Sequence, residues 1–260
     1  MTELAYIGIV EAADLMARRK LSPVEFAEAL FARIGKLDPT YHAFIEQTQQ
    51  LAMEAARAAE VEFAAGRIKG SLQGIPFGLK DIIDLAGVRT TCHSKIFEDH
   101  VAETDAVVTA RLKAAGAVPM GKLSTHEFAI GGPSFDLPWP PAVNPWGGAH
   151  FPGGSSSGSG VALASGMLPA ALGTDTGGSV RNPASMCAIV GMKATYGRVS
   201  RRGVFPLSYS LDHIGPMTRT VRDNAALLQV LSGYDRDDPG SIDTAVPDFS
   251  AEIGRDIEGL

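Results

Sequence analysis

Apolar residues near the start of the chain recur at helical spacing. Within residues 8–20 they lie three or four positions apart, as on one face of a helix. Ser22-Pro23-Val24-Glu25 then has the form of a capping box with proline at the first helical position. These signals predict two helices that end near Lys20 and Leu37, with a turn at Asp38-Pro39.

A third helix is predicted over residues 48–65, which are rich in alanine and glutamate, and Gly66 is its expected stop. Its apolar positions predict a buried side formed by Leu51, Ala55, Ala58 and Val61. Residues 1–66 are therefore expected to form a helical segment that packs on the rest of a single domain.

Short apolar runs then alternate with helical patterns. Residues 74–84 predict a strand bounded by glycine and proline, with Lys80 inside it. Residues 104–116 predict a helix capped by Thr104, followed by a strand at 117–120. This alternation of helices and strands indicates an α/β fold.

Turn-forming residues and acids dominate much of the remaining chain. Residues 131–150 hold five prolines and both tryptophans, which predicts a long ordered loop. Residues 195–199 suggest a strand or sheet edge, 210–216 a turn-rich connection, and 220–231 a capped helix. Residues 235–260 carry eight acids and little periodicity, which predicts an acidic connector.

Composition narrows the classes of function. The chain has 260 residues, 45% of them hydrophobic, and a net charge of −6 without a basic stripe, so we expect no direct nucleic-acid or membrane partner. Two cysteines are too few for a disulfide framework, and Glu3 and Glu11 interrupt what would otherwise resemble a signal peptide. We expect a cytoplasmic protein.

Lys80 is the first candidate for chemistry, because lysine is uncommon inside an apolar strand. It could extend its ammonium group to solvent at the strand end, as most lysines do. Alternatively, burial could lower the pKa of the amine and make it a base. The segment itself leaves both interpretations open.

Residues 151–191 contain two serine-bearing glycine turns, Gly153–Ser157 and Gly177–Ser179. The apolar residues between the turns argue against a flexible linker. A serine hydroxyl needs a positioned base before it becomes a nucleophile. Glycine lets backbone N–H groups approach a substrate oxygen, and residues 176–179 could direct several such donors at one point.

Three other motifs are present but incomplete. Residues 116–122 have the spacing of a phosphate-binding loop, but Leu123 stands where that loop needs serine or threonine. His126-Glu127 begins like a zinc-protease helix, but Ile130 replaces the second histidine. Residues 154–158 fit a nucleophile elbow with His213 as a downstream base, but no hydrophobic strand precedes them.

Several motifs together resemble the amidase signature family. They are Gly-Gly-Ser-Ser-Ser-Gly-Ser at 153–159, the segment 173–185, and Gly-Met-Lys-Ala-Thr-Tyr-Gly at 191–197. Gly78-Leu79-Lys80-Asp81 is similar to the family's lysine segment, and residues 212–217 are similar to its downstream block.

The resemblance implies a twisted mixed sheet flanked by helices, incomplete here at the carboxyl end, and hydrolysis of a carboxamide without metal or organic cofactor. It also implies a Ser–cis-Ser–Lys triad, with Ser179 as nucleophile, Ser155 as the bridging serine on a cis peptide after Gly154, and Lys80 as base. The residues expected to form the oxyanion hole or bind substrate are Thr176, Gly177, Gly178 and Arg181. Arg181 and Asp175 are also expected to brace the loop around Ser179.

Three alternatives remain for the function. The first is a stand-alone amidase acting on a small amide, which His126 favours because an acid is expected there in the second alternative. The second is the glutamine-hydrolysing subunit of the complex that amidates misacylated transfer RNA. The third is a catalytically silent fragment, because family members are much longer and residues 256–260 resemble the start of a further strand. A homodimer or a partner subunit is compatible with these interpretations.

Overall fold

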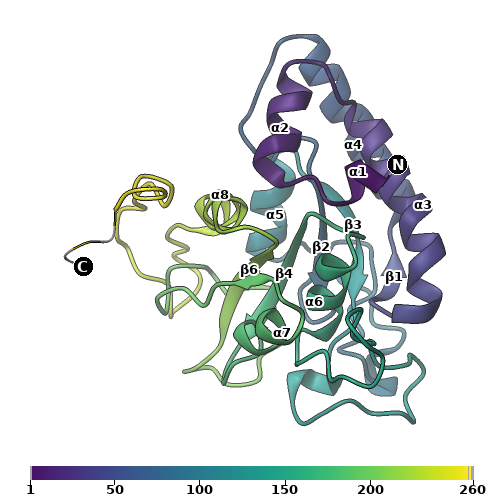
Figure 1. Ribbon diagram of the computed structural model, residues 1–260. Helices are drawn as coiled ribbons and strands as arrows, with labels where there is room; N and C mark the ends of the chain where they lie inside the picture. Colours follow the sequence, from purple (N-terminus) through teal and green to yellow (C-terminus); the bar gives the residue numbers. More distant parts are fainter. Residues whose placement is uncertain (1, 257, 259–260) are drawn as a thin grey trace.

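The computed structural model describes residues 2–256 and 258. It contains a six-stranded mixed sheet with the strand order β1-β3-β2-β4-β6-β5 (Figure 1). The strands are β1 (Phe44–Gln47), β2 (Pro76–Lys80), β3 (Val118–Leu123), β4 (Ala170–Asp175), β5 (Val190–Gly191) and β6 (His213–Thr218). The helices are α1 (Thr2–Ala5), α2 (Ile9–Ala17), α3 (Pro23–Tyr41), α4 (Gln49–Ala64), α5 (Val107–Ala114), α6 (Ser157–Ala164), α7 (Arg181–Met186) and α8 (Val221–Leu231). Two short 3₁₀ turns are η1 (Lys95–Phe97) and η2 (Glu127–Ala129).

The sheet brings three strand ends together at one edge. Strand β2 runs parallel to its neighbours β3 and β4, and β6 is antiparallel to β4. The carboxyl ends of β2 and β4 therefore lie beside the amino end of β6, where Asp175 is paired with His213. This mixed sheet among helices confirms the predicted α/β fold class, and the shared edge is where the candidate chemistry lies.

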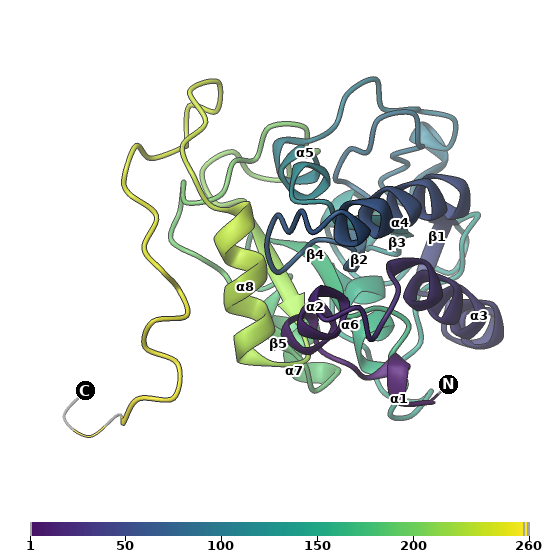
Figure 2. The same cartoon turned by 90° about the horizontal axis from the view of Figure 1, so that it is seen from above.

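Helices cover the sheet and bury β2, β3 and β4 completely. Helix α6 packs across β2, β3, β4 and β6, and it lies on the opposite side of these strands from α5 (Figure 2). Helix α4 packs on β3, and α8 packs on β6 and α5. The resulting core is continuous from α2 and α3 through the sheet to α8.

The N-terminal segment departs from expectation in two ways. Helix α3 does not end before Pro39 but continues to Tyr41, and the chain leaves it at His42, which has a left-handed φ of 51°. Asp38 Oδ1 then accepts hydrogen bonds from the N–H groups of Ala43 and Phe44. The segment is also not wholly helical, because β1 joins the sheet beside β3.

The buried face of α4 was predicted wrongly, although its bounds and its stop at Gly66 are as expected. Leu51 and Val61 are 39% and 62% exposed. The residues that face the interior are Ala52, Met53, Ala56, Ala59 and Phe63. In an alanine-rich helix the small residues can form the contact face, because they let the helix approach α3 and β3 closely.

Differences also occur at the later elements. Helix α5 starts at Val107 without a side-chain cap, so Thr104 does not cap it. Residues 195–199 form only an isolated bridge, from Val199 to Ser232. Residues 213–218 form strand β6 rather than a turn. Helix α8 begins as predicted, with the Thr220 side chain accepting from Asp223 N–H.

The acidic segment after residue 234 is irregular and runs away from the sheet (Figure 2). The expected start of a further strand at 256–260 falls mostly on residues 257, 259 and 260, which lie outside the described residues. Within residues 2–256 and 258, no helix combines the length and hydrophobicity needed to cross a membrane.

Candidate active site

Lys80 is the last residue of β2 and is fully buried. Its Nζ lies 2.7 Å from Ser155 Oγ and 2.7 Å from Thr174 Oγ1. The side chain therefore does not extend to solvent at the strand end. It ends among hydroxyl groups contributed by two other segments.

Burial lowers the pKa of Lys80 to about 7, although the nearby Asp175 and Asp212 oppose this shift. Near neutral pH a substantial fraction of the amine is therefore uncharged. A neutral amine has a lone pair that can accept the Ser155 hydroxyl proton while one of its N–H groups donates to Thr174. This arrangement suits a proton acceptor.

Ser155 is buried at the turn before α6, and the Gly154–Ser155 peptide bond is cis. Gly154 N–H donates to Asn182 Oδ1, and Ser155 C=O accepts from His126 N–H. The His126 ring packs against Gly154 so closely that a Cβ there would lie 2.0 Å from its Cε1. Only glycine fits beneath this imidazole, which explains the glycine before Ser155.

Asp175 organises the second glycine turn, which carries Ser179. Its buried carboxylate accepts from the N–H groups of Gly178, Val180 and Arg181. The Arg181 guanidinium adds a two-pronged contact, with Nε at 3.0 Å and Nη2 at 2.9 Å. Burial alone would raise the pKa of Asp175, but these hydrogen bonds outweigh it and hold the pKa below its usual value.

The two serine turns touch each other. Ser156 N–H donates to Ser179 C=O at 3.3 Å. Ser179 is half-buried, and its hydroxyl has no hydrogen bond to any residue that the structure describes. Ser156 Oγ in turn bonds the backbone of Thr174, so both turns are fixed to the end of β4.

The N–H groups around Ser179 are not equivalent. Gly178 N–H donates to Asp175 at 2.8 Å, so it is not free for a substrate oxygen. The N–H groups of Thr176, Gly177 and Ser179 have no acceptor among residues 2–256 and 258. The Arg181 guanidinium forms an ion pair with Asp175, and its side chain is 52% exposed. The geometry therefore favours Gly177 and Ser179 as oxyanion donors over Gly178.

A second buried lysine lies on the neighbouring strand. Lys122 of β3 forms an ion pair with Asp81 at 2.8 Å and also donates to Thr90 Oγ1. Because Lys122 is in register with Leu79, it projects from the opposite face of the sheet to Lys80. Lys122 lies in the segment with phosphate-loop spacing, which in the structure is strand β3.

The other incomplete motifs acquire ordinary roles. Among the described residues, no group of three or more His, Cys, Asp or Glu side chains could hold a metal ion. His213 Nδ1 lies against the carbonyls of Leu211 and Asp175. Cys92 and Cys187 are buried, and burial raises the pKa of each thiol to about 12, which makes them poor nucleophiles.

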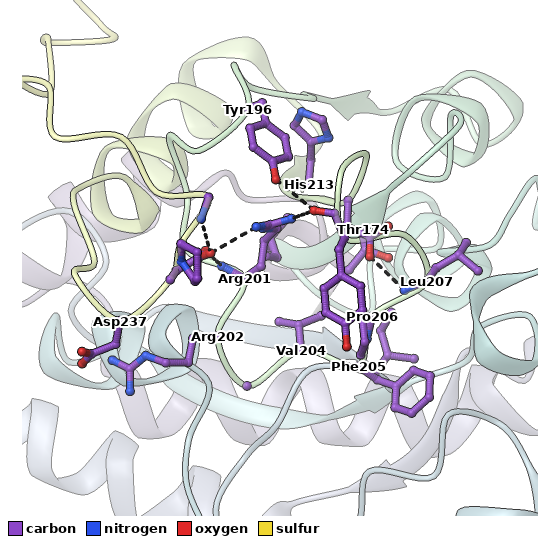
Figure 3. A pocket seen from close by; sticks show the side chains of 18 residues that line it. Thr174, Tyr196, Arg201, Arg202, Val204, Phe205, Pro206, Leu207, His213 and Asp237 are labelled. Atoms are coloured by element: carbon purple, nitrogen blue, oxygen red, sulfur yellow. Dashed lines mark hydrogen bonds and ion pairs between the residues drawn. The ribbon is translucent and has the colours of Figure 1, made fainter.

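A cavity of about 610 Å³ opens beside this site (Figure 3). Thr174, whose hydroxyl contacts Lys80, forms part of its wall. Asp212 also lines it and accepts from Thr176 Oγ1 at 2.5 Å. Thr174 alone therefore separates the cavity from Lys80, and Asp212 connects it to Thr176 beside the Ser179 turn.

Sequence reasoning did not find several of these contacts. Thr174, His126, Asn182 and Asp212 all contact the candidate site, and none was assigned a role there. Thr174 directly precedes Asp175 in the motif that carries Ser179, so its place at a strand end was the available signal. Asn182 lies in the same motif, three residues after Ser179, so it had a comparable signal. His126 had none, because it reaches Ser155 from a distant segment.

The chain is similar in sequence to a known family and to several curated proteins. The family model described as Amidase matches residues 25–260. A glutamyl-tRNA(Gln) amidotransferase subunit from Roseiflexus castenholzii is 47% identical over 260 residues, which are 100% of this chain and 53% of the relative. The Methylococcus capsulatus protein of the same name is 46% identical over 252 residues, 97% of this chain and 52% of the relative. The chain thus spans about half the length of the curated relatives it matches.

Solved structures match as well. One comes from work on a vestigial protein complex and the origins of an s-triazine catabolic enzyme; it has a TM-score of 0.94 and 38% identity, covering 98% of this chain and 56% of its own. The peptide amidase of Stenotrophomonas maltophilia has a TM-score of 0.84 and 34% identity, covering 90% of this chain and 49% of its own.

Proposed function

Because this chain belongs to the amidase family, we propose that it hydrolyses a carboxamide C–N bond through an acyl-enzyme on Ser179. The single observation that carries the proposal is the buried Lys80 amine hydrogen-bonded to Ser155 next to the Ser179 turn. A buried lysine that has no carboxylate partner among the described residues, and whose pKa is lowered to about 7, is arranged to accept a proton near neutral pH.

In the first half of the reaction, neutral Lys80 takes the Ser155 hydroxyl proton as Ser155 takes the proton of Ser179. Ser179 Oγ attacks the carbonyl carbon of the amide, and the oxygen that becomes negative accepts from the N–H groups of Gly177 and Ser179. Ser155 returns a proton to the nitrogen and Lys80 reprotonates Ser155. The C–N bond then breaks, ammonia or an amine leaves, and the acyl group remains on Ser179.

In the second half, water attacks the ester carbon of the acyl-enzyme. The same relay accepts the proton of the water and returns it to Ser179, which leaves as the alcohol. The products are a carboxylate and free enzyme. Every proton transferred and every bond formed or broken in these steps belongs to the substrate, to water or to these side chains.

A second candidate function is glutamine hydrolysis as part of an amidotransferase. It is favoured by the curated relatives named as glutamyl-tRNA(Gln) amidotransferase subunits, which are up to 47% identical to this chain. A protein of that kind would need a partner subunit to pass ammonia onward. The third candidate is a catalytically silent piece, which the following test distinguishes from the other two.

The test measures ammonia and hydroxamate released from acetamide, phenylacetamide and glutamine, with and without hydroxylamine. We expect ammonia from at least one amide and formation of its hydroxamate, because hydroxylamine competes with water for an acyl-enzyme. Ammonia without hydroxamate would contradict the covalent intermediate. A folded, monodisperse chain that releases no ammonia would support the silent piece, and glutaminase activity that requires a partner subunit would support the amidotransferase.

A further inference from the structure

We propose that the 610 Å³ cavity beside Lys80 receives the acyl part of the amide and selects an uncharged, apolar group there. The inference rests on the proposed hydrolysis and adds a substrate class to it. It comes from the position of the cavity, the apolar character of much of its wall and the ion pairs that already engage its two arginines.

The cavity is placed where an acyl group would lie. Thr174 connects its wall to the Lys80 amine, and Asp212 connects it to the Thr176 hydroxyl at the start of the Ser179 turn. A substrate whose carbonyl carbon lies at Ser179 has two sides, and Ser155 must face the nitrogen to protonate it. The acyl side then faces away from Ser155, and we assign it to the cavity.

Much of the wall is apolar. It is formed by the loop from Val204 to Leu207, together with Ile82 and Ile214 from the strand ends. In Figure 3, Val204, Phe205, Pro206 and Leu207 lie along one side of the space. Burial of an aromatic or branched alkyl group against such a surface contributes about 25 cal/mol per Å² of apolar area.

The cationic groups at the cavity are already paired. Arg201 donates to Asp238 and to the Tyr209 carbonyl, and its guanidinium stacks over the Tyr196 ring with 4.8 Å to the centroid. Its Nε is buried and has no hydrogen-bond acceptor among the described residues. Arg202 donates to Asp235 through Nε at 3.0 Å. Each guanidinium therefore already has one carboxylate partner.

Two of the three acidic groups at the cavity are also engaged by hydrogen bonds. Asp212 accepts from the N–H groups of Leu207 and Ser208 with one oxygen and from Thr176 with the other. Asp238 accepts from Arg201 and from Gly240 N–H. The remaining acid, Asp237, extends outward at 62% side-chain exposure. An α-amino acid such as glutamine would bring an ammonium and a carboxylate, and both charges would lose hydration against the apolar part of this wall.

The experiment measures binding, so that it does not depend on turnover. The Ser179→Ala chain is titrated with phenylacetamide, acetamide and glutamine by ligand-observed NMR and calorimetry. We expect phenylacetamide to bind at least about tenfold more tightly than glutamine, because its ring can enter the apolar space. Glutamine binding equal to or tighter than phenylacetamide would overturn the inference.

A pair of variants locates the binding. Leu207→Trp, in the same background, narrows the cavity and is expected to weaken phenylacetamide binding at least about fivefold. Leu211→Trp is the matched control, because Leu211 is exposed in the same loop but does not line the cavity. Equal affinities in the two variants would place the ligand elsewhere. Cavity binding in a chain that releases no ammonia would retain this assignment and remove the proposed function.

Discussion

Replacing Ser179 by alanine is expected to lower the rate of amide hydrolysis by at least about 10⁴-fold, because the acyl-enzyme can no longer form. The fold should survive this change. Ser179 is half-buried, its hydroxyl has no hydrogen-bond partner among the described residues, and its backbone contact to Ser156 N–H is retained. The measurement is ammonia release per enzyme under saturating substrate, together with a thermal unfolding curve.

Ser185→Ala provides the control for this experiment. Ser185 lies on α7, six residues after Ser179, and is exposed. Its loss should leave the rate within about twofold, since a surface substitution away from the site has small effects. If the two variants retained similar activity, Ser179 would not be the nucleophile and the proposed mechanism would be wrong.

Replacing Lys80 by methionine is expected to reduce hydrolysis by about 10³-fold or more, because it removes the proton acceptor and keeps most of the side-chain volume. The parent chain should also depend on pH through this residue. With a pKa of about 7, the active neutral fraction falls as pH is lowered. The rate should therefore rise about tenfold per pH unit below pH 7 and level off above it.

Lys122→Met is the matched control for Lys80→Met. Both lysines are fully buried on adjacent strands, but only Lys122 neutralises a buried carboxylate, that of Asp81. Its removal leaves that charge unpaired and should lower the free energy of unfolding by about 3–5 kcal/mol. Lys80→Met should instead leave a folded, inactive chain with no rise in activity between pH 6 and pH 8, values about one unit either side of the pKa of Lys80. Retained activity with the parent's pH profile would exclude Lys80 as the base.

The elements that could be predicted carry their own local signals. Ser22 and Thr220 cap their helices through side-chain hydrogen bonds, as the spacing indicated. Strand β6 could not be predicted in this way, because His213-Ile-Gly-Pro is typical of a turn. It becomes a strand because β4 pairs with it along its whole length, and such pairing overrides local preference.

In the candidate site too, local features could be predicted from the sequence, whereas contacts between distant segments could not. Lys80 and Ser155 are 75 residues apart. Their residue types made both candidates, and the family resemblance assigned them to one triad before the structure showed their hydrogen bond. Periodicity and spacing carry no information about such long-range pairs. The difference at Gly178 has a similar cause, because its N–H meets Asp175 only once the turn has closed.

Because of the Asp175 carboxylate, the amide protons of the Ser179 turn should exchange with solvent at two different rates. The protons of Gly178 and Val180 are held by a buried carboxylate, so they should exchange slowly in deuterated water. Those of Gly177 and Ser179 have no acceptor in the described structure and should exchange quickly. Adding a ligand whose carbonyl oxygen reaches the turn should slow the second pair alone. Residue-resolved exchange would then mark the oxyanion donors without any turnover, and protection of Gly177 and Ser179 in the free chain would contradict their assignment.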